Sequence, residues 1–429
     1  MSSSPLRAAW ICVALLVALL AFRLGEPGWG AGATPSYLYD EAYTAFEAGR
    51  ILRHDAVVFR PAARRFEYLA SGANDLAPTS RGEWSHPPFA PLAVAGTSAI
   101  FGWSAFGARL AALLAAALTL AAVARLAGRR HAIAACLLLG LDGVFFVFGR
   151  TALPHVFVVA GVTTGVLATR MALVRPSRWL HAATLAGFAF GCATAARWTA
   201  LPVALLVGLA VLGSREGRRL PRARFAGVLA ASVVATYLAT WAPAWASGMS
   251  PRAFVELHAQ MAWFHTHLPS CSGASSPPYT WPWLRHPVIF TVRAQGDART
   301  MVAAAGNPLL WWGLVPAVVA LAIRARGRGA RALVPLAAIV GVLLPWAFAE
   351  RFGFFYYLLP ALPFVAIALA ELTARARRLR VVHLALAATF FVASYPVLAA
   401  VPLGPSAMEL ERALHGMPRG ALAAGQASR

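Results

Sequence analysis

Long apolar runs separated by short, arginine-rich connections recur along this chain from one end to the other. Runs of roughly 17 to 23 apolar residues are long enough to cross a hydrocarbon core of about 30 Å. Only 13% of the residues are charged and 59% are hydrophobic, whereas a soluble domain carries roughly 25% charged residues. The pattern predicts an all-α polytopic membrane protein.

The basic residues indicate which side of the membrane each connection occupies. The formal net charge is +22, and every basic residue is an arginine. The arginines cluster between apolar runs, as in RLAGRR at 125–130 and RARGRGAR at 324–331, which is typical of cytoplasmic loops. Such loops also attract membrane lipids with anionic headgroups. The charge therefore indicates topology and argues against a nucleic-acid partner.

One apolar segment, 88–103, decides the topology. If it spanned, every later arginine cluster would change sides. Its shortness and its prolines and glycines predict a re-entrant or interfacial helix instead. About eleven spans then remain, with a cytoplasmic N-terminus, an external C-terminus, and a first span that is retained and not cleaved. The expected spans lie near 6–23, 105–127, 131–149, 153–172, 180–197, 199–213, 225–246, 308–323, 332–349, 353–371 and 381–403.

Two long connections are expected outside the membrane, at about 24–104 and 247–306. Long loops in compact proteins are usually functional or disordered, and their Trp, Tyr, His and Pro content argues against disorder. The membrane domain is expected over 1–404, followed by a short external tail over 405–429. A transporter usually shows internal repeats, and none is evident, so transport is the weaker alternative to catalysis.

The first external loop carries an acidic pair in SYLYDEAYTAF at 36–46. Asp40 and Glu41 begin a predicted helix, where acidic residues are favoured by the helix dipole. A carboxylate at the lipid–water boundary is also suited to be a general base, because partial desolvation raises its pKa. The residues alone leave both interpretations open.

Several arginines lie on the side where topology does not explain them. Arg109, Arg150 and Arg197 are each expected near the external face, and Arg351 follows the boundary residue Glu350. Such cations suit a lipid-linked phosphate, while snorkelling to the interface is the alternative. Charged residues at a membrane boundary are functional candidates by default.

Histidines and aromatic residues gather in both external loops. His86 precedes two prolines and is suited either to bind a phosphate oxygen or to cap the next segment. His265 and His267 form a short pair, but the loop has no convincing set of further metal ligands. Trp281 and its aromatic neighbours are suited to an interfacial belt or to stacking on a sugar.

These stretches, taken in order, resemble the protein O-mannosyltransferase family, the dolichyl- or polyprenyl-phosphate-mannose–protein mannosyltransferases. The motifs that carry the resemblance are the DE pair, HPP, GARLAALLAA, LD…GR, RWTALP, FH…SPPYTWPWLRHP, GNPLLWW and FFYYLLPALPF. The resemblance covers nearly the whole chain. It implies a membrane-embedded GT-C-type glycosyltransferase fold with an external active site in the plasma membrane.

The resemblance also implies the reaction and its residues. Mannose would pass from a polyprenyl phosphate to a Ser or Thr hydroxyl of an exported polypeptide, with inversion of the anomeric configuration. No cofactor is expected, and whether a divalent cation takes part is left open. Asp40 would be the base, with Glu41 beside it. The other expected site residues are Arg150, Arg197, Arg351 and His86 at the donor phosphate, and His265, His267, Trp281 and Glu350 at the acceptor or sugar.

The chain departs from the family pattern in ways that leave both the acceptor and the donor sugar open. His155 stands where the family usually has an aspartate, and CSGASSP replaces a motif of the second loop. The absence of β-trefoil repeats points to a bacterial member. A contact with the secretion machinery is a further expectation for an enzyme that acts on exported polypeptides. An enzyme of the same fold that glycosylates a lipid or polysaccharide is the alternative within the same class.

Overall fold

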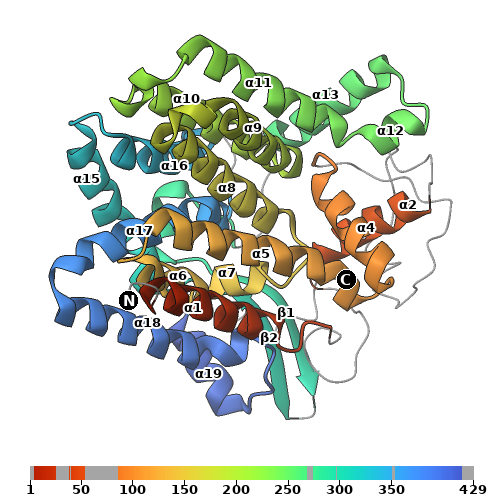
Figure 1. Ribbon diagram of the computed structural model, residues 1–429. Coiled ribbons are helices and arrows are strands. Elements are labelled where there is room, and N and C mark those ends of the chain that lie inside the picture. Colours follow the sequence, from red (N-terminus) through yellow and green to blue (C-terminus); the bar gives the residue numbers. More distant parts are fainter. Residues whose placement is uncertain are drawn as a thin grey trace.

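The computed structural model describes residues 4–25, 38, 40–53, 86–267, 274–295, 297–349 and 353–417. Within these ranges the protein is a bundle of helices with one two-stranded antiparallel sheet, formed by β1 (Val288–Gln295) and β2 (Ala298–Ala304) (Figure 1). The polytopic helical architecture predicted from the apolar runs is therefore confirmed.

Eight of the described helical segments are long and apolar enough to cross a membrane. They are Ala105–Ala127 (α5), Pro154–Val174 (α8), Pro176–Ala196 (containing α9, Trp179–Ala196), Arg222–Ala239 (α11), Pro308–Ala325 (α14, Pro308–Trp311, and α15, Leu314–Ala325), Ala330–Ala347 (α16), Phe355–Arg375 (η7, Phe355–Ala361, and α17, Leu362–Leu372) and Arg377–Leu398 (α18). Three shorter apolar helices are Leu6–Ala21 within α1 (Ser4–Ala21), α4 (Phe89–Phe101), and Trp198–Gly213, which contains α10 (Leu201–Gly213). The count of eleven spans stays a prediction.

The expected span at 131–149 is not one continuous helix. It is divided into α6 (Ala132–Gly140) and α7 (Gly143–Phe148), and Asp142 at the break caps α7 by accepting a hydrogen bond from the Phe145 amide at 2.9 Å. The other Asp142 oxygen accepts from the Asn307 amide at 2.8 Å and from Trp311 Nε1 at 2.7 Å. A buried carboxylate with these partners holds the break in place, because leaving it unsatisfied would be costly.

Helix α4 has a length consistent with the proposal that 88–103 does not span. Its 13 residues extend about 20 Å at 1.5 Å per residue, less than a hydrocarbon core of about 30 Å. Ser104 then caps α5 by accepting from the Gly107 amide at 3.1 Å. The chain therefore turns into α5 directly after this short helix.

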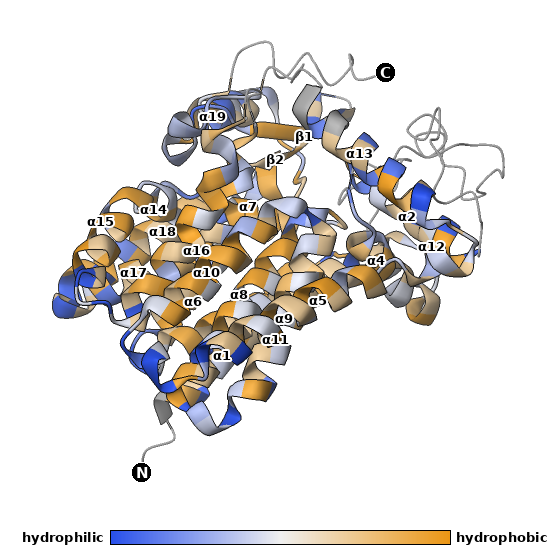
Figure 2. Ribbon diagram, turned by 90° about the horizontal axis from the view of Figure 1, so that it is seen from above, coloured by the Kyte–Doolittle hydropathy of each residue, from blue (hydrophilic) through white to orange (hydrophobic). Residues whose placement is uncertain are grey.

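Several elements lie together at one end of the bundle. Helices α2 (Glu41–Leu52), α12 (Ala242–Ala246), α13 (Pro251–His267) and α19 (Pro405–Leu414), together with the hairpin, lie beyond an orange apolar zone in Figure 2. The expected tail after 404 thus begins with an ordered helix, whose Met408 packs against Met301 and Val397. Helix α2 packs on α4, and α4 on α5, so the acidic pair is placed against the first part of the bundle.

Candidate active site

Asp40 lies at the N-terminus of α2 with its carboxylate uncommitted to the helix. It is the N-cap residue, yet no side-chain capping hydrogen bond is formed within the described structure. Asp40 is exposed to solvent although protein surrounds it on most sides, and burial raises the pKa of its carboxyl to about 6 while the nearby Arg197 charge opposes the rise. A carboxyl that titrates near neutral pH and remains accessible is suited to accept a proton.

Glu41, the adjacent residue, has an entirely different environment. Its side chain is fully buried, and its two oxygens accept hydrogen bonds from Arg109 Nε and Nη2, both at 2.9 Å. The same oxygens accept from the backbone amides of Leu38 and Ala152, also at 2.9 Å. Glu41 therefore ties α2 to α5 and to the turn before α8, and it positions Asp40 without facing an open site.

Arg197 is presented at a break between two apolar helices. It ends α9 with extended backbone angles of φ −156° and ψ 135°, and a short 3-10 turn at Trp198–Ala200 leads into α10. The prediction that 180–213 contains two helices is therefore confirmed. This interruption brings Arg197 toward Asp40, whose pKa it lowers.

The Arg197 guanidinium is held by two groups from distant parts of the chain. Its Nη1 donates to Nε2 of His155, and its Cζ lies 5.0 Å from the centre of the Tyr357 ring. His155 also stacks on Tyr357, with ring centres 5.6 Å apart and planes 16° apart. A histidine nitrogen that accepts from arginine is unprotonated, so His155 orients Arg197 without cancelling its charge.

The two external loops meet beside this group. His86, just before α4, stacks on His265 of α13 with ring centres 4.9 Å apart and planes 18° apart. Trp198, the residue after Arg197, lies 6.4 Å from the His265 ring. The structure thus brings together two histidines that the sequence predicted as site residues, 179 positions apart in the chain (265 minus 86).

A hydrogen-bonded chain fixes the orientation of Trp198. Trp198 Nε1 donates to the Tyr237 hydroxyl at 3.0 Å, and this hydroxyl lies 2.7 Å from Nε2 of His258. His258 Nδ1 lies 2.8 Å from the Phe254 carbonyl oxygen. Burial lowers the pKa of His258, in accord with a neutral ring that donates from Nδ1 and accepts at Nε2. The chain anchors α13 to the turn that carries Arg197.

Arg150 and Trp281 do not present open faces. Arg150 is 1% exposed, donates to the Phe22 carbonyl and lies 4.9 Å from the centre of the Phe146 ring. Its role at a donor phosphate stays a prediction, since in this structure it tethers the end of α1. Trp281 is fully buried and donates to the Ser276 carbonyl at 3.0 Å, and its stacking on a sugar stays a prediction.

Three of the expected site residues lie beyond what the structure describes. Glu350 and Arg351 are outside the described residues, and so is the side chain of His267. In the part that is described, no group of three or more His, Cys, Asp or Glu residues could hold a metal ion.

Sequence reasoning missed the aromatic residues that support the site. Tyr357 carries both His155 and Arg197, and Trp346 stacks on its ring at 4.5 Å and 21°. The only sequence signal is the aromatic run FFYY at 354–357, which does not reveal which ring faces Arg197.

Two family models match the chain. Residues 85–243 match the model described as dolichyl-phosphate-mannose-protein mannosyltransferase, and residues 251–406 match the C-terminal four-transmembrane region of protein-O-mannosyltransferase. A polyprenol-phosphate-mannose–protein mannosyltransferase of Mycobacterium tuberculosis is 27% identical over 415 residues, covering 76% of this chain and 79% of the relative. One from Mycolicibacterium smegmatis is 26% identical over 501 residues, covering 94% and 92%.

Solved structures with low sequence identity share the fold. The Saccharomyces cerevisiae protein O-mannosyltransferase Pmt1–Pmt2 complex bound to the sugar donor aligns with a TM-score of 0.68 at 12% identity, covering 93% of this chain and 92% of that chain. ArnT from Cupriavidus metallidurans bound to undecaprenyl phosphate aligns with a TM-score of 0.56 at 13% identity, covering 99% and 79%. The expected GT-C-type fold is therefore confirmed.

Proposed function

The chain belongs to the protein O-mannosyltransferase family, and from this premise we propose that it transfers mannose from a polyprenyl-phosphate donor to a protein. The observation that carries the proposal is the placement of the accessible Asp40 carboxylate, whose pKa burial raises to about 6, close enough to Arg197 for the guanidinium charge to act on it. One group is suited to accept a proton and the other to stabilise a phosphate. An inverting glycosyl transfer needs both functions.

The proposed step begins at the acceptor, a Ser or Thr hydroxyl. Asp40 removes the hydroxyl proton while the oxygen attacks the anomeric carbon of mannose. The new carbon–oxygen bond forms on the face opposite the lipid phosphate, and the bond to that phosphate breaks, so the anomeric configuration inverts. The electron pair leaves with the polyprenyl phosphate. The proton remains on Asp40.

Arg197 supports the leaving phosphate in this proposal. A fixed cation lowers the barrier where negative charge develops in the transition state. His155 contributes by holding Arg197 through an uncharged nitrogen, which leaves the full positive charge for the phosphate. His86 and His265 border the same region and are proposed to line the donor and acceptor paths.

The proposal places this chemistry outside the plasma membrane, with a cytoplasmic N-terminus and an external C-terminus. Cysteines substituted for Arg129 and Arg175, in two arginine clusters, should be shielded from impermeant thiol reagents in intact cells. A cysteine substituted for Tyr279, which is 76% exposed in the second large loop, should be labelled. Labelling of both arginine-cluster positions would overturn this orientation. The expected contact with the secretion machinery finds no support in the described structure.

A transfer assay tests the reaction directly. Purified protein is given synthetic polyprenyl-phosphate mannose and a Ser/Thr-rich peptide, and labelled mannose in the peptide is measured. Asp40→Asn should lower the transfer rate by a factor on the order of 10² to 10⁴, the usual contribution of a general base.

The matched control is Asp297→Asn, the same chemical change at an exposed position in the β1–β2 hairpin; it should transfer normally. Normal transfer by Asp40→Asn at an equal protein level would refute the assignment of the base. Label found in lipid or polysaccharide and not in peptide would identify the alternative enzyme of the same fold.

A further inference from the structure

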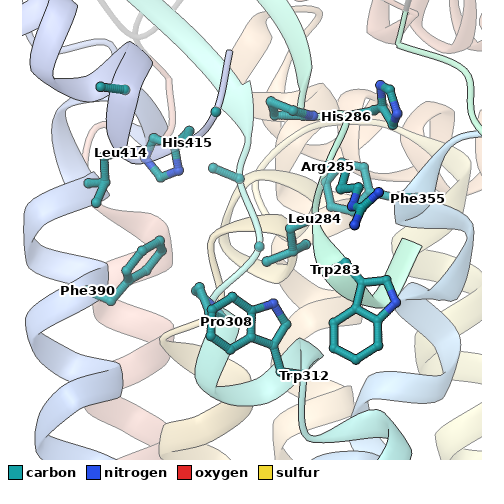
Figure 3. A pocket seen from close by; sticks show the side chains of 15 residues that line it. Trp283, Leu284, Arg285, His286, Pro308, Trp312, Phe355, Phe390, Leu414 and His415 are labelled. Atoms are coloured by element: carbon teal, nitrogen blue, oxygen red, sulfur yellow. The ribbon is translucent and has the colours of Figure 1, made fainter. Parts of the chain in front are cut away.

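One cavity of the described structure is lined by none of the residues of the Asp40 and Arg197 group. Its volume is about 570 Å³, in the range of small-ligand sites, and residues of η6 (Pro278–Trp283), α14, α18 and α19 contribute to its walls (Figure 3). Phe355 of η7 lines the cavity, and Tyr357, which lies against Arg197, is not among the lining residues. The cavity is therefore not part of the proposed transfer site.

The ionisable side chains that line this cavity are basic. Arg285 and His286 lie on one side and His415 on the other (Figure 3). Arg285 is exposed and forms no hydrogen bond or ion pair with any residue that the structure describes. No acidic residue is among the described residues of the lining. The charge of the cavity thus suits an anion.

His415 provides an independent sign of a polar ligand. It is 9% exposed, and its Nε2 has no hydrogen-bond partner in the described structure, although a Glu411 carboxylate oxygen lies 3.4 Å away. A buried polar group without a hydrogen bond costs free energy. The Glu411 oxygen lies within ion-pair distance but makes no hydrogen bond with Nε2, and a ligand oxygen in the cavity would give Nε2 an acceptor with hydrogen-bond geometry.

The cavity also adjoins a surface that meets lipid chains. Trp312, in its lining, is 54% exposed at the start of the Pro308–Ala325 span. Val315, Val319 and Ile323 follow on the same helix at spacings of three and four and are also exposed, so they form one continuous face. An apolar face on a spanning helix contacts hydrocarbon, and tryptophan favours the headgroup level. This face, from Trp312 to Ile323, is called the α15 stripe below.

We propose that the cavity binds the phosphate headgroup of an anionic glycerophospholipid, whose acyl chains lie along the α15 stripe. The Arg285 guanidinium presents several N–H donors to phosphate oxygens in a planar arrangement, and His286 and His415 offer further donors. An apolar stripe directly beside a basic cavity matches a lipid, which carries both parts in one molecule. A soluble anion would make no use of the stripe. This site is independent of the proposed transfer reaction.

Native mass spectrometry of the delipidated full-length protein tests the site. Phosphatidylglycerol and phosphatidylcholine with identical acyl chains are added in turn, and the lipid-bound fraction is measured. Wild type should retain phosphatidylglycerol more tightly than phosphatidylcholine. Arg285→Gln should weaken phosphatidylglycerol binding about fivefold, the effect of one basic residue near anionic headgroups. Phosphatidylcholine binding should stay unchanged.

The control variant is Arg252→Gln, which removes the same charge from an exposed position on α13, outside the cavity lining; it should bind phosphatidylglycerol as wild type does. Equal retention of the two lipids, or unchanged binding by Arg285→Gln, would overturn the proposal. Complete displacement of phosphatidylglycerol by millimolar inorganic phosphate would indicate a site for free anions and also overturn it. So would retention of a polyprenyl phosphate that phosphatidylglycerol cannot displace.

Discussion

Replacing Glu41 by glutamine should destabilise the protein, because it weakens the buried interactions that hold the start of α2, and with it Asp40, in place. The Glu41 carboxylate accepts four hydrogen bonds, two from Arg109 and one each from the Leu38 and Ala152 amides. Glutamine has nearly the same shape, but one acceptor oxygen becomes an NH₂ group and the negative charge is lost. Arg109, whose side chain is fully buried, then has no counter-charge from Glu41.

The cost follows from that burial. Breaking a buried ion pair by removing one partner destabilises a protein by about 3–5 kcal/mol, a large part of a typical stability of about 5–15 kcal/mol. Glu41→Gln should therefore lower both the yield and the apparent melting temperature of the purified protein.

Asp40→Asn should shift stability in the opposite direction. The pKa of Asp40 is raised in the folded state to about 6, against about 3.9 in an unfolded chain. The folded protein then binds the proton more tightly, so ionisation of Asp40 costs stability as the pH rises from about 4 through 6. At pH 7.5 the neutral asparagine avoids this cost, and the melting temperature should stay equal or rise.

A double-mutant comparison tests the magnitude. Thermal unfolding is measured for full-length Glu41→Gln, Arg109→Met and the double variant in the same detergent. The double variant has no unpaired buried charge, so it should unfold at a higher temperature than Glu41→Gln alone. The reasoning fails if Glu41→Gln unfolds at the wild-type temperature, or if adding Arg109→Met to it brings no recovery.

Three further predictions concern the site and its supports. The transfer rate should fall as the pH drops through about 6, because protonated Asp40 cannot accept a proton. Arg197→Gln should move this acid limb of the pH–rate profile to higher pH, because it removes the charge that lowers the Asp40 pKa. An acid limb that does not move would show that Arg197 does not act on Asp40. His155→Asp should raise the donor KM roughly tenfold, since a carboxylate would pair with Arg197 at about the strength of a charged hydrogen bond. His155→Gln should leave the donor KM near the wild-type value. Equal KM values for the two variants would count against a role of His155 in keeping the Arg197 charge available. Asp142→Asn should lower the free energy of unfolding by about 1–3 kcal/mol, because the amide nitrogen cannot accept the hydrogen bonds from Asn307 or Trp311. Transfer per folded molecule should change little. An unchanged melting temperature would show that the Asp142 hydrogen bonds at the break between α6 and α7 contribute little to stability.

The sequence by itself determined the features that depend on neighbouring residues. Apolar runs of spanning length predict the helical bundle, because hydrocarbon requires backbone groups to be paired within each segment. The interruption at 197–200 and the short 89–101 helix were also readable, since proline, arginine and segment length act locally. The order of the motifs was enough to indicate the family.

Only the tertiary structure decided which polar residues are available for chemistry. Asp40 and Glu41 are adjacent and chemically alike, yet Glu41 is enclosed by Arg109, 68 residues away, and by the Ala152 amide, 111 residues away. Arg150 and Arg197 looked equivalent in the sequence, but one donates to a carbonyl at the end of α1 and the other lies near Asp40 on the ring of Tyr357. The side of the membrane on which a helix begins depends on its own residues and on the charges next to it in the chain. The partner that a side chain meets is set by how distant helices pack, and no local pattern in the chain records that packing.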